Sequence, residues 1–174
     1  MTVAPLWVSS PEHLKQFTTI RAEASWWRRL IGAYRIPAGF PHVEVWWGLL
    51  PIKAPMVIFA QGALTLDGAR LRFEPTRQPR WMQVLGTRWR NLDGRFVMDL
   101  AREDIESIEP FTVPEAFLRY FTPPWVRIRA LRGPPGGREL LLAVGSNLLP
   151  VGSLRGRNAR FASVLREWRY GSGG

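Results

Sequence analysis

The last third of the chain has a regular alternation of apolar and polar positions. From Val126 to Ala130 apolar residues alternate with arginines, and this period of two is typical of a half-buried strand. Glycines and prolines at 133–137 interrupt the chain, and the apolar run 140–144 predicts a returning strand. Three apolar residues then recur at helical spacing, and we expect their helix to direct them into the interior: Phe161, Leu165 and Trp168.

A second helical pattern lies near the N-terminus. Ser10, Pro11 and Glu12 favour a helix start, because they cap a free N–H group, preset the backbone and complement the helix dipole. Apolar residues follow at steps of three and four: Leu14, Phe17, Ile20, Ala24, Trp27, Ile31 and Tyr34. The spacing predicts one amphipathic helix over residues 11–33.

Short strands and turns are expected in between. Alternation at 43–47 predicts a strand, which the neighbouring prolines place at a sheet edge or in an irregular stretch. Asp67-Gly68 predicts a hairpin and Asp93-Gly94 a second turn. Further strands are expected at 81–89, 96–100 and 105–108. Turns at this spacing favour an antiparallel barrel or sandwich, with the final helix across one opening.

Length and composition fit one domain, alone or with an extension. The 174 residues and the 46% hydrophobic share predict a packed core. The absence of cysteine excludes disulfides, thiolate metal sites and cysteine nucleophiles. The N-terminus has no signal-peptide pattern, and prolines, Gly62 and Lys53 interrupt the most apolar stretch, Val45–Leu66. We expect a soluble, cytoplasmic protein, with a peripheral position at the membrane as a variant.

The net charge of +10 is unevenly distributed. Residues 99–118 carry −5, whereas residues 119–174 carry +8. Such a surface would attract a membrane, nucleic acid or an acidic protein. The alternative is a compositional origin, because 22 of the 24 basic residues are arginine, as GC-rich genomes favour.

Several short motifs together resemble a known family. They are Gly62–Leu66, Arg70–Pro75, Phe96–Leu100, Asp104–Glu109, Trp125–Ile128, Leu140–Gly145 and Phe161–Trp168. In this order they look like the first hairpin, the middle strands, the late hairpin and the single C-terminal helix of GRAM-type, pleckstrin-homology-like domains. The resemblance covers about residues 55–169.

The resemblance implies a mainly β fold, an antiparallel barrel of two near-orthogonal sheets capped by the C-terminal helix. The barrel would occupy residues 55–170, after an N-terminal helix and lead-in segment over 1–54 and before a flexible tail over 171–174. The function would be non-catalytic binding of a protein partner or an anionic membrane surface, without a cofactor.

Many domains of this family bind inositol phospholipids through a basic residue on the first strand and a basic and aromatic pattern on the second. The run from Arg70 through Arg72 to Phe73 resembles the second part, whereas Met56–Leu66 holds no basic residue for the first. The candidate ligand-binding residues are Arg70, Arg72, Arg127 and Arg129. Their alternation with apolar residues fits the solvated face of antiparallel strands equally well.

Tryptophans beside arginines supply two further hypotheses. Trp26, Arg28, Arg29 and Trp46 could contact a membrane or a partner, as interfacial anchors do. The alternative packs Trp27 between the first helix and the barrel, with Trp26 partly exposed. A nucleic-acid surface would instead use stacking and basic groups from Trp81, Arg88, Trp89, Arg90, Arg127 and Arg129.

Catalytic chemistry is sparse in this sequence. His13 and His42 are the only histidines, and no phosphate-binding glycine loop or nucleophile-elbow motif occurs. The acidic run 99–109 fits a solvated edge better than a metal site. We therefore expect no metal site, no cofactor and no enzymatic activity.

Overall fold

The computed structural model describes residues 1–78, 80–114, 124–134, 137–145 and 154–171. Most of its strands form one seven-stranded sheet in the order β7-β5-β4-β1-β10-β9-β8, in which every neighbouring pair is antiparallel. These strands are β1 (Thr2–Ser9), β4 (Ala60–Asp67), β5 (Arg70–Pro75), β7 (Met98–Ala101), β8 (Ile105–Phe111), β9 (Trp125–Ala130) and β10 (Glu139–Val144). The expectation of a mainly β, antiparallel protein is confirmed.

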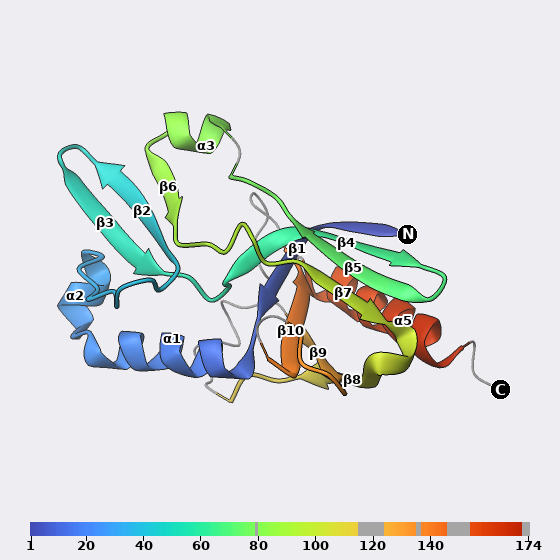
Figure 1. The fold of residues 1–174 in the computed structure, drawn as a ribbon. Helices are drawn as coiled ribbons and strands as arrows, with labels where there is room; N and C mark the ends of the chain where they lie inside the picture. The colour runs from blue at the N-terminus through green and yellow to red at the C-terminus, as the bar shows by residue number, and fades with distance from the viewer. Residues whose placement is uncertain (79, 115–123, 135–136, 146–153, 172–174) are drawn as a thin grey trace.

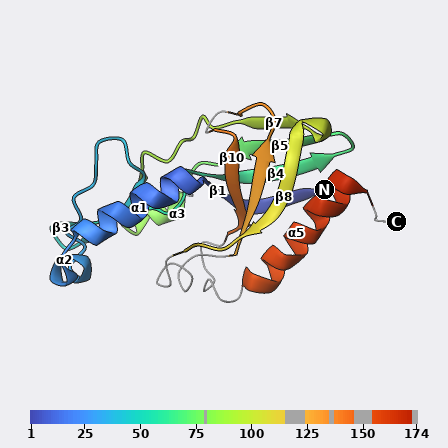
Figure 2. The ribbon, with the colours of Figure 1, turned by 90° about the horizontal axis from the view of Figure 1, so that it is seen from below.

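The large sheet is curled into a half-barrel (Figure 1). Its two edge strands, β7 and β8, are consecutive in the chain and are linked only by the 3-10 turn η1 (Arg102–Asp104). Because this link is so short, the two edges of the sheet must lie near each other. Figure 2 shows the helix α5 (Arg155–Tyr170) lying across the curl beside β8.

The closing helix packs as its spacing predicted. Phe161 and Leu165 are buried among the side chains inside the curled sheet, and Trp168 packs against the same cluster. The alternation in β9 is also confirmed, because Val126 and Ile128 are buried and point into that cluster. The barrel core thus follows from short-range apolar periodicity.

A second, smaller sheet has the order β3-β2-β6 and contains β2 (His42–Trp47), β3 (Leu50–Pro55) and β6 (Thr87–Arg90). With α1 (Pro11–Glu23), α2 (Trp26–Leu30) and α3 (Arg80–Val84) it forms the left half of Figure 1. The expected strand at 43–47 is therefore correct, but it is the central strand of this sheet. We call this half the second lobe.

Helix α1 joins the two halves. Its Leu14, Phe17 and Ile20 pack with Leu141 and Ala143 on the outer face of β10. The apolar run of β10 is thereby explained: alternate residues face the barrel interior and α1, so the strand is buried on both faces.

The expected single helix over 11–33 is wrong. Ser10 caps α1 through a 3.1 Å hydrogen bond from the His13 N–H to its Oγ, as predicted. The helix ends at Glu23, because Ala24 has an extended backbone, and the short helix α2 follows. The Nε of Arg29 donates to the Ala24 carbonyl at 2.7 Å and so satisfies an acceptor that the break exposes.

The N-terminal strand β1 was missed by the sequence interpretation. It lies between β4 and β10, so the expected division at residue 54 does not follow the sheet, and β4–β5 is not its first hairpin. Pro5 explains why β1 was missed, because a proline within a strand pattern argues against a central strand. In the structure Pro5 falls where the β1–β4 register shifts between Val3 and Leu6, and a proline is tolerated at such a bulge.

The expected strand over 81–89 is also wrong. Its first half is the helix α3, and only Thr87–Arg90 is a strand, because Gly86 with a φ of 77° separates the two. The Asp67-Gly68 hairpin between β4 and β5 is confirmed. The long connection over 115–123 and most of the expected tail lie outside the described residues.

One buried amide fastens α5 to the sheet. Asn158 is 1% exposed, its Oδ1 accepts from the Val144 N–H at 2.7 Å, and its Nδ2 donates to the Val144 carbonyl at 3.1 Å. The same Nδ2 donates to the Leu154 carbonyl at 3.0 Å. The Asn158 amide thus forms hydrogen bonds with the backbone N–H and carbonyl of Val144, the last residue of β10, as a neighbouring strand would.

We predict that Asn158→Ala lowers the free energy of unfolding by about 2–4 kcal/mol. The substitution leaves the buried N–H and carbonyl of Val144 without partners and opens a small void. Urea denaturation followed by circular dichroism would measure the change. Ser163→Ala on the exposed side of the same helix is the control, and an equal loss from both would contradict the assigned role.

Candidate functional site

The four arginines proposed as ligand-binding residues are all in ion pairs. On β5 the Nε of Arg70 lies 2.7 Å from the Asp99 carboxylate, and Arg72 lies 3.6 Å from Asp67 and 3.7 Å from Asp99. The hydrogen bond from Arg70 lowers the pKa of Asp99 below its ordinary value. These cations are therefore already paired with carboxylates.

The arginines of β9 are paired in the same way. Arg127 contacts Glu109, and Arg129 contacts Glu139 at 2.7 Å. Each pair joins residues that are directly opposite in neighbouring strands. The strands β5 and β9 are separated in the sheet by β4, β1 and β10, so the structure does not combine the two arginine pairs into one site.

Exposed large apolar side chains are concentrated in the second lobe. In the described part of the chain, ten of the fourteen exposed large hydrophobic residues belong to α2, the β2–β3 hairpin, α3 and the adjoining turns. We call this surface the apolar end: Trp26, Trp27, Leu30, Ile31, Val45, Trp46, Leu49, Leu50, Val84 and Leu85. In Figure 1 its segments lie at the far left, where α2 and the β2–β3 hairpin are, and at the top, where α3 is.

The exposure of the apolar end is high. Trp26 is 77%, Leu49 94% and Val84 86% exposed, and α2 has no buried residue. The alternative in which Trp27 packs the first helix onto the barrel is wrong, because Trp27 is 47% exposed and follows the helix break. The side chain of Trp47 lies outside the described residues.

Backbone contacts hold the three pieces of the apolar end together. The Lys53 N–H on β3 donates to the Gly32 carbonyl just after α2 at 3.1 Å. Gly32 has a φ of 68°, and a Cβ at this position would overlap Ile52, so only glycine permits this approach. On the other side, the Trp46 N–H on β2 donates to the Gly86 carbonyl between α3 and β6 at 3.3 Å.

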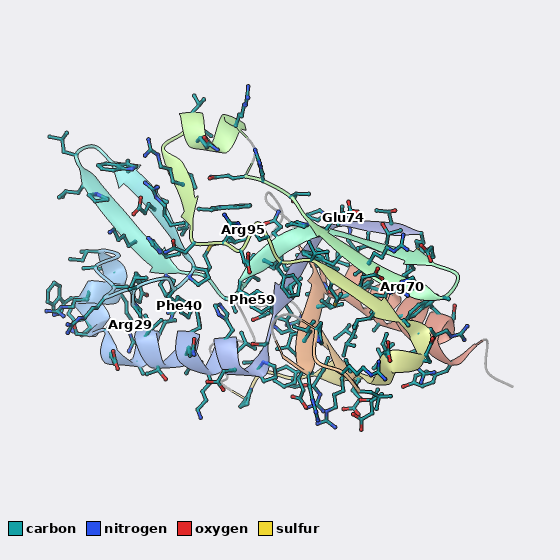
Figure 3. The ribbon with its side chains drawn as sticks, in the orientation of Figure 1. Arg29, Phe40, Phe59, Arg70, Glu74 and Arg95 are labelled. Atoms are coloured by element: carbon teal, nitrogen blue, oxygen red, sulfur yellow. The ribbon has the colours of Figure 1, made fainter. Side chains whose placement is uncertain are left out.

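The stretches of sequence that carry the apolar end are rich in cations and contain almost no acids. Glu44 is the only acidic residue between Glu23 and Asp67, and none occurs between Glu74 and Asp93. These two stretches carry Arg28, Arg29, Arg35, Lys53, Arg77, Arg80, Arg88 and Arg90. Figure 3 shows Arg29 at this extremity, whereas Arg70 and Glu74 lie on the barrel.

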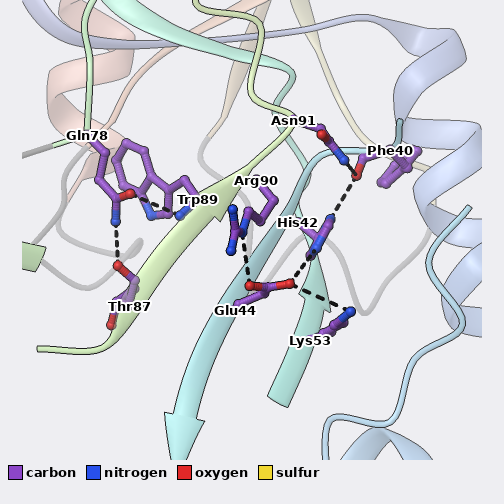
Figure 4. Close-up of polar contacts among 9 residues, drawn as sticks. All are labelled: Phe40, His42, Glu44, Lys53, Gln78, Thr87, Trp89, Arg90 and Asn91. Atoms are coloured by element: carbon purple, nitrogen blue, oxygen red, sulfur yellow. Dashed lines mark hydrogen bonds and ion pairs between the residues drawn. The ribbon is translucent and has the colours of Figure 1, made fainter. Parts of the chain in front are cut away.

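The single acid of this region has a structural role (Figure 4). The buried Glu44 on β2 accepts a 3.0 Å hydrogen bond from Arg90 on β6 and lies 3.6 Å from Lys53 on β3. The Nε2 of His42 lies 3.5 Å away. The hydrogen bond from Arg90 is the main cause that holds the pKa of Glu44 below its ordinary value. Glu44 thus clamps all three strands of the small sheet.

Both histidines are held by backbone carbonyls. His13 lies 3.0 Å from the Met56 carbonyl and stacks on Phe40, and burial lowers its pKa. The Nδ1 of His42 lies 3.0 Å from the Phe40 carbonyl. Within the described ranges, no three His, Asp or Glu side chains gather as metal ligands would.

A cleft of about 1080 Å³ opens between α1, the segment 37–41 and the segment 91–93. Its wall contains Phe40 and Phe59, which Figure 3 shows between α1 and the barrel. The charged residues that line it are Glu12, Glu23 and Asp93, and no lysine or arginine among the described residues lines it. The cleft therefore does not suit an anionic ligand.

The proposed nucleic-acid set is scattered. Arg88 is exposed on β6, whereas Arg90 binds Glu44 and the Trp89 N–H donates to Gln78. Arg127 and Arg129 lie on β9 in the other sheet, and the side chain of Trp81 lies outside the described residues. Sequence spacing alone suggested this set, and the fold separates its members.

Comparisons with protein-family models and with curated proteins give no match for this chain. The candidate site therefore rests on the geometry and charge described above. None of the helices in the described part of the chain has the length and apolar character needed to cross a bilayer.

We predict that Glu44→Gln lowers the free energy of unfolding at pH 7 by about 1–2 kcal/mol, because charge-assisted hydrogen bonds between the strands are weakened. Since the pKa of Glu44 is lowered in the folded state, its contribution is present above pH 4.5 and is lost as the pH falls below that value. The difference between the parent chain and the variant should therefore narrow in acid.

Thermal unfolding at pH 7 and at pH 3–4 would measure this difference. Glu74→Gln is the matched control, because Glu74 is exposed and has no ion pair in the described structure. A stability difference that stays constant over this pH range would contradict the role of the Glu44 carboxylate.

Proposed function

We propose that this protein is a non-catalytic binding module with a pleckstrin-homology-like barrel, which docks on anionic membrane surfaces through its apolar end. The observation that carries the proposal is the concentration of exposed tryptophan and leucine side chains on α2, the β2–β3 hairpin and α3, in stretches that also carry exposed arginines such as Arg28 and Arg88.

The strand arrangement supports the pleckstrin-homology-like part of the proposal. Two antiparallel meanders, β7-β5-β4 and β10-β9-β8, flank β1 and curl toward each other. A single C-terminal helix lies against the interior cluster, as the resemblance implies. In this scheme α1, α2, β2 and β3 are inserted after the first strand, α3 and β6 are inserted between β5 and β7, and these insertions carry the docking surface.

The side-chain chemistry favours a membrane over a protein partner. Tryptophan is suited to the interface of a bilayer, and exposed leucines can enter the acyl region. Each arginine near an anionic surface contributes about 1 kcal/mol. The centre of a protein interface, by contrast, is depleted of charged residues. In the apolar end Arg28 lies over the ring of the exposed Trp27, at 5.3 Å from its centroid.

The geometry also permits docking without unfolding. Trp26, Leu30, Leu49 and Leu50 protrude and hold no core position. Entry of these side chains into lipid would bury apolar surface, and full burial of one such side chain is worth about 1.5–3 kcal/mol. Glu44 keeps the small sheet that carries the hairpin intact.

We predict that the protein sediments with vesicles of phosphatidylcholine and phosphatidylserine, and weakly with phosphatidylcholine alone. Trp26→Ala/Leu49→Ala should lower the partition coefficient at least tenfold, because two exposed apolar contacts are removed. Arg28→Ala should weaken binding most at low salt, where charge attraction is least screened.

The control is Val97→Ala/Leu131→Ala, which removes two exposed apolar side chains from the barrel half. It should bind like the parent chain. Failure of the parent chain to bind either vesicle, or equal loss from both double variants, would refute docking through the apolar end.

A further inference from the structure

The outward side of α5 is a second concentration of unpaired positive charge. Arg155, Arg157, Arg160 and Arg166 are exposed, and none of them forms an ion pair with a residue that the structure describes. The only acid of the helix is Glu167. The function proposed above does not use this surface.

The four arginines lie along the two sides of a strip on the outward face of α5. At 100° per residue, Arg155 and Arg166 fall on one border of the outward face, and Arg160 and Arg157 fall on the other. The residues between the borders are Gly156, Ala159 and Ser163, which are exposed and small, and, at the C-terminal end, the exposed Glu167 and Tyr170. The four arginines span roughly 16 Å of helix axis at 1.5 Å per residue.

The position of the first two arginines is unfavourable for the helix itself. The first turn of α5 has no acid, and its N-cap residue Leu154 makes no side-chain cap. Positive charge at this end opposes the helix dipole, at a cost of about 0.3–1 kcal/mol for each residue. The placement therefore needs a reason outside the stability of the fold.

Phosphate is the anion that fits these residues best. The planar guanidinium binds phosphate oxygens with two parallel hydrogen bonds. Apart from Tyr170 in the last turn, the strip has no large apolar side chain that could enter a membrane. Only Tyr170, in the last turn, could stack on a base, so the surface is not a platform for single strands.

We propose that the outward face of α5 binds the phosphate backbone of duplex nucleic acid without reading its sequence. The two borders of arginines lie on either side of a helix about 10 Å wide, which is close to the 12 Å width of the DNA major groove. Figures 1 and 2 both place α5 in the half of the molecule away from α2. This face is therefore available while the apolar end is occupied.

Fluorescence anisotropy of the full chain with labelled 20-base-pair DNA and RNA duplexes tests the proposal. Four phosphate contacts predict that the logarithm of the affinity for DNA falls with the logarithm of salt at a slope of roughly −3.6. Arg155→Glu/Arg157→Glu should weaken binding at least tenfold and reduce the slope by about 2. The same variant should be at least as heat-stable as the parent, because acids at this end favour the helix dipole.

The matched control is Arg95→Glu/Arg132→Glu, which reverses two exposed arginines outside α5 and should keep full affinity. Equal loss from both variants would show attraction by net charge alone and overturn the proposal. So would a flat salt response, tighter binding of single strands, or equally tight binding of polyglutamate. Trp26→Ala/Leu49→Ala should leave duplex binding unchanged, so this test fails or succeeds independently of membrane docking.

Discussion

The fold depends on the pairing of β1 with both β4 and β10. This strand is the only link in the sheet between the meander β7-β5-β4 and the meander β10-β9-β8. Leu6 and Val8 are fully buried on it, and so anchor both halves to one interior. The strands beside β1 pack closely. A Cβ at Gly145, just after β10, would lie 2.2 Å from the Trp7 indole, and a Cβ at Gly62 on β4 would lie 2.0 Å from the Glu74 carbonyl on β5. Both positions therefore require glycine.

The curled sheet also determines which charged residues are paired with one another. On the barrel, acidic residues of β7, β8 and β10 lie opposite arginines of β5 and β9, so the acidic segment 99–118 and the basic strands neutralise each other. Between Glu23 and Asp67, the stretch that carries α2 and the β2–β3 hairpin, the one carboxylate is Glu44, and it is paired within its own sheet. Exposed arginines without an ion pair in the described structure include Arg28 in the apolar end and Arg155 and Arg160 on α5.

The two proposed surfaces differ in chemistry because their surroundings differ. The apolar end combines large side chains with arginines, which suits an interface between water and lipid. The outward face of α5 combines arginines with small residues, which suits close contact with a charged, rigid backbone. Helix α5 can carry this face because its inward side is fixed by Phe161, Leu165 and the amide of Asn158. A rigid support of this kind reduces the ordering cost of binding.

The sequence by itself determined the elements whose pattern is local: the β4–β5 hairpin at Asp67-Gly68, the alternation of β9, the cap at Ser10 and the inward side of α5. Periodicity and turn chemistry act over a few residues and can be read directly. Only the tertiary structure decided that β1 is central, that Arg70 and Arg127 are neutralised, and that Trp26 and Leu49 are both exposed in the second lobe. These features depend on partners far along the chain, from Glu109 for Arg127, which is 18 residues away, to Val144 opposite Leu6, and no local pattern encodes such pairings. The physical reason is that cross-strand register and charge pairing are set when the sheet curls.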